Sequence, residues 1–510
     1  MVLDWCYFAW FSIFLVPFFF LVLSRKKSCS HRLPPGPPGW PIFGNLFDLG
    51  TLPHQTIAGM KLRYGPVVLL RIGSVKTIAI LSAKVATEFF KNHDACFADR
   101  KIIDTMLVHN YNKSSLVLAP YGTYWRVLRR ICTVEMFTNK RINETAHLRQ
   151  KCIDSMLQWI DKEAKSMKKG SGIEVARFIF LASFNMMGNL MLSRDLVDPE
   201  SKKASEFFTA MEGLMEWSGQ PNISDIFPCL RWLDIQGLRQ KAGRDMGKAI
   251  EVASTFVKER LKEHKEGEYK KDFLEVLLEF EGSGKDEPAK LSEHQINIFI
   301  LEMFIAGSET SSSSVEWALA ELLCNPEAMT RVKAEINEVV GSNRKFEESD
   351  IDNLHYMQAV VKETLRLHPP APLLVPRRAI QDTSFMGYDI SEDTQVFVNA
   401  WAIGRDPECW EDPWAFKPER FLNLSSKTTD FKGQNFEFIP FGAGRRMCAG
   451  LPLGNRMSHL LLGSLLHAFD WELPSNVTPK SMDMKERMGM TVRKLQPLQV
   501  VPIKNEHILY

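Results

Sequence analysis

The stretch "FGAGRRMCAG", residues 441–450, decides how this 510-residue chain is interpreted. Of the nine cysteines, Cys448 is the one that lies in a loop rich in glycine and arginine. Glycine lets a backbone turn tightly and approach a ligand closely. The apolar, helix-periodic segment 451–469 follows directly, so we expect a helix to begin just after the thiol. Free amides at a helix N-terminus favour a thiolate and lower its pKa.

A stable thiolate at Cys448 could serve as a nucleophile, a zinc ligand or a haem ligand. A zinc site needs further Cys or His ligands at short spacing, and the sequence contains neither C-x-x-C nor H-E-x-x-H. A papain-like nucleophile would need local signatures that are also missing. A haem needs one axial thiolate and cations for its propionates, and Arg446 is well placed to be one of these cations.

The loop resembles the haem-binding loop of the cytochrome P-450 family. The matching positions are Phe441, Gly444, Arg446, Cys448 and Gly450. The resemblance, which extends over essentially the whole chain, implies that Cys448 is the axial thiolate ligand of haem b, iron protoporphyrin IX. It also implies that Phe441 and Arg446 contact this cofactor. A buried structural cysteine is the alternative.

Two further motifs of the family occur in the expected order. "KETLRLHPP" places Glu363 and Arg366 on one helix face at i, i+3. Arg420 in "FKPERF" matches the family's third partner. A Glu with two Arg can satisfy charges that would be costly if each were buried alone. By resemblance, this triad is structural and supports the haem loop.

Three residues resemble the family's contacts to the haem propionates. Trp125 and Arg129 in "YWRVLRR" stand at i, i+4, so both can reach one propionate. Arg377 in "LVPRRA" resembles another propionate donor, although Arg378 is adjacent. Without the cysteine loop, each of these arginines would be interpreted as a solvated charge.

The segment "FIAGSETSSSSVEWALAEL" resembles the oxygen-activation helix of the family. The matching positions are Ala306, Gly307, Glu309, Thr310 and Ser311. The resemblance implies that Ala306 and Gly307 leave room for dioxygen against the haem, while Thr310 and Glu309 deliver protons as catalytic groups. The alternative is a helix with an ordinary polar face.

The N-terminal segment 5–23 is apolar apart from one Ser and is followed by "SRKK". Nineteen helical residues span about 28 Å, which is enough to cross the hydrocarbon core. Because basic residues stay cytosolic, we expect a single-pass anchor in the endoplasmic reticulum membrane with the remaining chain facing the cytosol. A cleaved signal peptide is the alternative. Segment 24–44 is interpreted as a basic stop-transfer sequence followed by a stiff proline-rich linker.

Residues 45–510 are expected to form the catalytic domain. "RYGPVVLLRIGSVKTIAILS" and "TSFMGYDISEDTQVFVNAWAI" predict short strands and hairpins, whereas most of the remainder has helical periodicity. We therefore predict a mainly α fold with small β-sheets, the cytochrome P-450 fold, in a single large haem-binding domain behind the N-terminal transmembrane helix.

Composition and motifs limit the partners. A net charge of +2 argues against nucleic acid. No G-x-G-x-x-G fingerprint occurs, so electrons must come from outside, and the resemblance implies NADPH acting through a membrane-bound NADPH–cytochrome P-450 reductase. We expect its acidic face to dock on the basic residues Arg126, Arg129, Arg130, Lys140 and Arg141.

The substrate is inferred from resemblance alone. The proline-rich arm, "AGSET" and "PFGAGRRMCAG" look like plant microsomal A-type enzymes, and "RRMCAGLPLGNR" resembles the branch with geraniol 8-hydroxylases and iridoid oxidases. This implies hydroxylation of a small apolar monoterpenoid or iridoid with O2. Alternatives are a flavonoid or alkaloid hydroxylase, an oxygen-independent haem-thiolate isomerase or dehydratase, and a haem sensor. The predicted pocket residues are Met106, Leu107, Phe304, Ala371, Leu373, Val375, Met488 and Met490.

Overall fold

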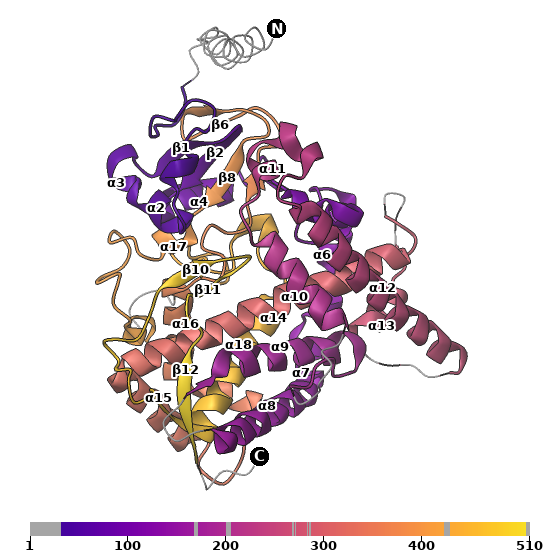
Figure 1. Cartoon of the computed structure of the whole chain (residues 1–510), viewed down its shortest axis with the longest axis vertical. Coiled ribbons are helices and arrows are strands. Elements are labelled where there is room, and N and C mark those ends of the chain that lie inside the picture. Colours follow the sequence, from indigo (N-terminus) through magenta and orange to yellow (C-terminus); the bar gives the residue numbers. More distant parts are fainter. Residues whose placement is uncertain are drawn as a thin grey trace, which may run out of the picture.

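A computed structural model describes residues 32–167, 172–199, 206–267, 270, 272–282, 284, 287–422 and 429–505. The predicted anchor, 5–23, and residues 24–31 of the predicted linker lie outside the described residues. Helices make up most of the described chain (Figure 1). The α-helices are α2 (Pro53–Gly59), α3 (Lys61–Tyr64), α4 (Ala83–Asn92), α5 (Tyr111–Ser114), α6 (Thr123–Arg130), α7 (Asn139–Glu144), α8 (Ala146–Ser166), α9 (Val175–Leu192), α10 (Glu206–Ser218), α11 (Ile223–Ile226), α12 (Leu238–Lys265), α13 (Phe273–Leu278), α14 (Glu293–Cys324), α15 (Pro326–Val339), α16 (His355–Leu367), α17 (Ala400–Ile403) and α18 (Leu451–Ala468).

Short 3-10 turns connect many of these helices, and one π-helical turn, η4 (Ile131–Met136), extends α6. The 3-10 turns are η1 (Leu46–Asp48), η2 (Asp104–Met106), η3 (Val108–Asn110), η5 (Pro228–Leu233), η6 (Glu348–Asn353), η7 (Pro418–Phe421) and η8 (Gly444–Arg446).

The strands form four small sheets. The largest has the order β1 (Val67–Ile72), β2 (Val75–Ile80), β8 (Gln395–Val398), β5 (Arg377–Arg378) and β3 (Asp99–Arg100). The others are β4 (Ile173–Glu174), β12 (Gln499–Lys504) and β9 (Phe469–Glu472), then β10 (Glu486–Met488) with β11 (Val492–Lys494), and β6 (Thr383–Phe385) with β7 (Tyr388–Ile390). β1 and β2 pair antiparallel around Gly73, so the predicted hairpin is present. In Figure 1, β8 from late in the chain lies beside the N-terminal strands.

The 32-residue helix α14 runs through the middle of the molecule (Figure 1). It begins with a capping box, in which Ser292 and Gln295 satisfy each other's free amide groups. It packs against α9, α12, α16 and α18, so most of its side chains are buried although its sequence is rich in serine. This central position makes α14 a rigid support for any side chain it directs into a cavity.

Among the described residues, α9 is the one helix long and apolar enough to cross a membrane. Because 83% of its apolar window is buried inside the fold, α9 is a core helix. The main hydrophobic core combines α8, α9, α14 and α18, and a second core lies under the five-stranded sheet. The mainly α fold with small sheets that the sequence predicts is confirmed.

Candidate active site

The loop 441–450 is a tight turn that delivers Cys448 to the start of α18. Gly442 and Gly444 have positive φ values of 71° and 68°, a conformation that glycine adopts readily. A Cβ on Gly444 would also lie 2.3 Å from Asp94 Oδ1, so no larger residue fits there. The Cys448 amide donates to the Phe441 carbonyl at 3.0 Å, and α18 begins three residues later. The predicted position of the thiol before a helix is therefore correct.

The pKa shift of this thiol is opposite in direction to the expectation. Amide groups of Gly450 and Leu451 and the charge of Arg129 do lower the pKa of Cys448, but burial raises it more, so the net shift is upward. Helix-start amides are too weak to offset the loss of water around an anion. A bound metal ion would reverse this balance, because a coordinating thiol is deprotonated outright.

The thiol faces an interior cavity of about 300 Å³. α14 also lines this cavity, where Ala306 is exposed and Gly307 and Thr310 are half-buried within an otherwise buried helix. The Thr310 hydroxyl donates to the Ala306 carbonyl at 2.6 Å. Gly307 has a packing role as well, since a Cβ there would lie 2.6 Å from Met187 Sδ on α9. The thiol and the predicted oxygen-activation segment thus line the same cavity.

Four arginines line the same cavity: Arg100, Arg129, Arg377 and Arg446. Arg446 donates to the carbonyls of Ala98, Leu116 and Ala119 at 2.8, 3.3 and 2.6 Å. Arg129 donates to the Met447 carbonyl, and Arg100 donates to the carbonyls of Val117 and Val375. Arg377 alone is paired with a carboxylate, Asp94, at 2.6 Å.

This cluster carries more positive charge than its neighbours neutralise. Burial, and then the charge of Arg377, lower the pKa of Arg446 to about 10. Burial and the charges of Arg377 and Arg446 also lower the pKa of Arg100. A cavity with a thiol on one wall, a surplus of guanidinium groups and apolar side chains elsewhere fits a flat apolar ring that carries carboxylates. The residues present therefore fit a haem with its propionates.

Trp125 and Phe441 also line the cavity. Trp125 Nε1 donates to the Leu116 carbonyl at 2.9 Å, and its ring lies 4.5 Å from the Arg446 guanidinium. Phe441 packs on Phe431 with ring centroids 5.3 Å apart. The indole therefore supports Arg446, and its N–H already has a partner in this structure.

The triad forms as the spacing predicts. Arg366 Nε and Nη2 donate to the two Glu363 oxygens at 2.8 and 2.7 Å, and Arg420 Nε donates to Glu363 at 3.0 Å. Arg366 also donates to the carbonyls of Gly404, Pro413 and Ala415. This network ties α16 to η7 and to the segment before it, without contact to the cavity.

Glu309 and Thr310 are adjacent in sequence but point to different places. Glu309 Oε1 accepts from Thr491 Oγ1 at 2.7 Å and from Arg493 Nε at 2.6 Å, next to β11. Its other oxygen is buried without a hydrogen-bond partner among the described residues. Glu309 lines a second, wider cavity of about 1150 Å³ between α9, α10 and the β10–β11 hairpin.

Two anchoring carboxylates, Glu302 and Asp94, could not be predicted from the sequence. Glu302 on α14 is 1% exposed and accepts from the amides of Leu116 and Val117 at 2.6 and 2.9 Å, so it fixes the segment that lines the cavity beside Trp125. Asp94 accepts from Arg377 and from the Arg445 amide at 2.9 Å. Both partners are distant in sequence, so local patterns could not reveal them.

The predicted substrate-pocket residues are spread over four places. Ala371 and Val375 line the thiol cavity. Met488 and Met490 line the wider cavity, and Leu107 lines a third pocket near β3. Phe304 is fully buried between Phe184 and Phe207, and Leu373 and Met106 are buried in core clusters.

Comparisons with known proteins agree with this fold and cavity. The sequence model of the Cytochrome P450 family matches residues 34–500. Cytochrome P450 76A2 of Solanum melongena is 60% identical over 98% of this chain and 99% of that protein. Iridoid oxidase of Catharanthus roseus is 52% identical, over 97% and 96% of the two chains. Geraniol 8-hydroxylase of the same species is 39% identical, over 95% and 96%.

A solved structure shares the fold as well. A zebra fish cytochrome P450 with abiraterone superposes with a TM-score of 0.72 at 26% identity, over 89% of this chain and 100% of that chain. Fold and sequence together define an oxidoreductase of the haem-thiolate class. The chain belongs to the cytochrome P450 family and is a P450 monooxygenase. The family and the likeness to the iridoid oxidase and geraniol 8-hydroxylase branch, predicted from the sequence, are confirmed.

Proposed function

We propose that this monooxygenase hydroxylates a small terpenoid of the monoterpenoid or iridoid class at the Cys448 cavity. The observation that carries the proposal is a single cavity lined by the Cys448 thiol, by Ala306 and Thr310 of α14, and otherwise by mostly apolar side chains. Relatives named iridoid oxidase, geraniol 8-hydroxylase and drimenol monooxygenase support the substrate class. An apolar lining suits a hydrocarbon substrate, because it leaves no buried polar group without a partner.

In the proposed site, Cys448 holds the iron and Arg446, Arg129 and Arg377 hold the propionates. When bound, the haem supplies oxygen activation and C–H hydroxylation, and the protein decides which carbon is presented. Thr310 holds a proton at its Oγ1, next to the cavity. Glu309 receives protons from the wider cavity while Thr491 and Arg493 hold its carboxylate. Proton delivery by such positioned groups is the catalytic contribution of α14.

The proposed electron donor is NADPH acting through its reductase at the Arg129 side of the molecule. Arg126 and Arg130 on α6 are exposed, and Arg129 of the same helix touches the cysteine loop through Met447. A basic helix that connects the surface to the loop suits an acidic redox partner. The double variant Arg126→Glu, Arg130→Glu should slow reduction by the reductase, while chemical reduction by dithionite stays unchanged.

We further propose that the enzyme sits on the endoplasmic reticulum membrane through segment 5–23. An apolar surface supports this proposal: Trp40 and Phe47 near the start of the described chain are 60% and 65% exposed, and Trp232 on η5 is 78% exposed. Phe43 connects the N-terminal aromatic residues with η5, because its ring centroid lies 6.1 Å from that of Phe227, the residue before η5. Large exposed aromatic side chains are costly in water and favoured at a membrane interface.

The substrate proposal is tested with the purified enzyme, reductase, NADPH and a panel of terpenoids, flavonoids and alkaloids. We expect hydroxylated products from monoterpenoids or iridoids, in amounts that depend on O2. Thr310→Ala should consume NADPH with a lower yield of product, because proton delivery is impaired. Turnover of flavonoids or alkaloids with no turnover of terpenoids would contradict the substrate class.

A further inference from the structure

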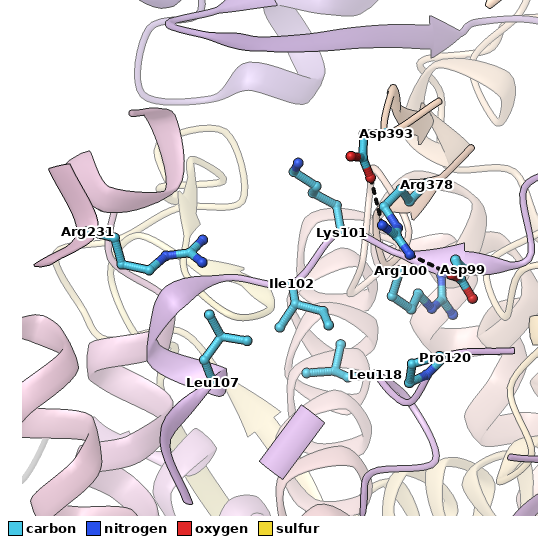
Figure 2. Close-up of a pocket in the computed structure, with 10 residues that line it drawn as sticks. All are labelled: Asp99, Arg100, Lys101, Ile102, Leu107, Leu118, Pro120, Arg231, Arg378 and Asp393. Atoms are coloured by element: carbon cyan, nitrogen blue, oxygen red, sulfur yellow. Dashed lines mark hydrogen bonds and ion pairs between the residues drawn. The ribbon is translucent and has the colours of Figure 1, made fainter. Parts of the chain in front are cut away.

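Figure 2 shows the residues that line a polar pocket of about 230 Å³. This pocket is distinct from the thiol cavity. Its lining comes from β3, the segment after it, η5, β5 and the turn before β8. Arg100 is the one residue that lines both this pocket and the thiol cavity. The pocket therefore shares one side chain with the group of four arginines that lines the thiol cavity.

Four cations and two carboxylates line this pocket, and their pairing is uneven. Arg378 donates to Asp393 at 2.6 Å and to Asp99 at 2.7 Å, so both lining carboxylates share one arginine, as Figure 2 shows. Arg231 contacts Asp104 at 3.0 Å from behind the pocket. Arg100 has carbonyl partners only.

Lys101 is the lining cation that has no direct partner among the described residues. Its ammonium group has no hydrogen bond or ion pair within the described part of the chain. Burial lowers the pKa of Lys101. The charges of Asp393 and Asp225 oppose this shift, and those of Arg378 and Arg231 add to it. In Figure 2 the Lys101 side chain extends into the space between Arg231 and Arg378. A half-buried cation without a direct partner costs stability, and a ligand that pairs with it offsets this cost.

The remaining lining is apolar: Ile102, Leu107, Leu118 and Pro120. Lys101 and Arg231 both line the pocket without pairing to its two carboxylates, and the Arg231 side chain is 34% exposed, so both offer donors to a carboxylate ligand. Asp99 and Asp393 disfavour a more highly charged anion such as phosphate. The apolar floor suits the hydrocarbon stem of the ligand.

We propose that this pocket binds a small organic carboxylate, with the carboxylate on Lys101 and Arg231 and the stem on Ile102 and Leu107. It is a second ligand site, distinct from the one that holds the oxidised substrate, and it does not depend on the terpenoid assignment. Its occupant places a negative charge next to Arg100, and so next to the cofactor cavity.

The test measures binding of hexanoate to the haem-loaded full chain in lipid nanodiscs by isothermal titration calorimetry, with empty nanodiscs subtracted. Hexanol and inorganic phosphate are the comparison probes. We expect saturable binding of hexanoate, and weaker binding of both comparison probes. Absence of saturable binding would overturn the proposal. Equal affinity for hexanol would overturn the carboxylate contact, and equal affinity for phosphate would overturn the contact with the stem.

Lys101→Met is the informative variant, because removal of this cation breaks no direct ion pair among the described residues. We expect about a tenfold loss of hexanoate affinity, the size of a lost charged hydrogen bond. Lys101→Arg should stay close to the wild-type affinity, and so should Lys84→Met, which removes an exposed lysine of α4. Unchanged affinity in Lys101→Met would contradict the site.

A second variant keeps the test decisive if Lys101→Met does not fold. Leu107→Asp introduces a carboxylate at the apolar floor and should abolish hexanoate binding by charge repulsion and loss of apolar contact. The carbon monoxide spectrum of the reduced protein confirms that the variant keeps its cofactor. Undiminished hexanoate binding in a spectrally intact Leu107→Asp protein would overturn the proposal.

Discussion

Two of the regions that hold buried arginines, the triad and the thiol cavity, differ in the partners of these arginines. In the triad, Arg366 is 1% exposed and shares the Glu363 carboxylate with Arg420. Around the cavity, Arg446 is 8% exposed and donates only to backbone carbonyls. The same residue type is thus neutralised within the protein in one region and left with a surplus charge in the other.

This difference separates a structural network from a ligand site. A buried guanidinium with its carboxylate in place needs nothing further, whereas one with carbonyl partners alone is stabilised further by any anion that arrives. We therefore expect the cavity arginines that have carbonyl partners alone to bind an anionic ligand, at the expense of the stability of the protein without it. The following experiments change one region at a time.

The largest effect is expected from Glu363→Gln in the triad. The substitution leaves Arg366 and Arg420 buried without their carboxylate, and breaking such a pair costs about 3–5 kcal/mol. We expect this loss in the free energy of unfolding, measured by denaturant titration, or failure to accumulate folded protein. Glu392→Gln, at an exposed position, serves as the control. A triad variant within about 1 kcal/mol of the wild type would contradict a structural role.

In the cavity, Arg446→Met should affect cofactor binding more than folding. Loss of a charged contact to a propionate costs about 1.5–3 kcal/mol, so the haem affinity should fall about ten- to a hundredfold. The cofactor-free protein should lose less stability than Glu363→Gln does, because removal of Arg446 leaves no carboxylate unpaired. Haem titration and denaturation of the same preparation measure both quantities. Equal haem affinity in variant and wild type would contradict the assignment.

His459 on α18 is a buried basic residue of another kind. A histidine can lose its charge on burial, whereas an arginine keeps it. Burial lowers the pKa of His459 to about 4, and its Nε2 has no hydrogen-bond partner among the described residues. Between about pH 6.5 and pH 4 the unfolded chain binds this proton and the folded chain does not. The free energy of unfolding should therefore fall by about 3 kcal/mol as the pH falls through this range.

The measurement for His459 is denaturant unfolding at several pH values between 4 and 7. His459→Gln should remove that part of the pH dependence, because glutamine does not titrate. Other groups contribute equally to both proteins, so the difference between the two curves isolates His459. Parallel curves for variant and wild type would show that the imidazole does not titrate as its burial requires.

The smallest effect is expected at the surface. Arg130 on α6 donates to Glu287 at 2.7 and 3.0 Å, and its side chain is 43% exposed. Exposed ion pairs of this kind contribute about 0–1 kcal/mol, so Arg130→Ala should shift the free energy of unfolding by no more than that. A loss comparable to that of Glu363→Gln would remove the contrast between buried and exposed arginines.

Local patterns predicted the parts of the site that are close in sequence. The turn and following helix around Cys448, the Glu363–Arg366 pair at i, i+3 and the β1–β2 hairpin depend on neighbouring residues, and all three are present. The family resemblance added Arg420, which joins Glu363 from 57 residues away. These features depend on backbone geometry that the sequence specifies locally.

The features that the sequence did not reveal depend on tertiary packing. Arg100 enters the cavity because its short strand pairs at the edge of the sheet, and Glu302 reaches Leu116 and Val117 across 185 residues or more. Glu309 faces Arg493 because β11 packs on α14. The upward shift in the pKa of Cys448 likewise comes from burial, which a local motif does not encode.

The most direct test of haem ligation is the absorption spectrum of the reduced protein with carbon monoxide, recorded for Cys448→Ala and for Cys409→Ala, an exposed free cysteine. We expect Cys409→Ala to show the thiolate-type band and full haem content. Cys448→Ala should lose that band, most of its haem and its product formation. A Cys448→Ala protein with the wild-type spectrum and unchanged turnover would contradict the assignment of this thiol as the iron ligand.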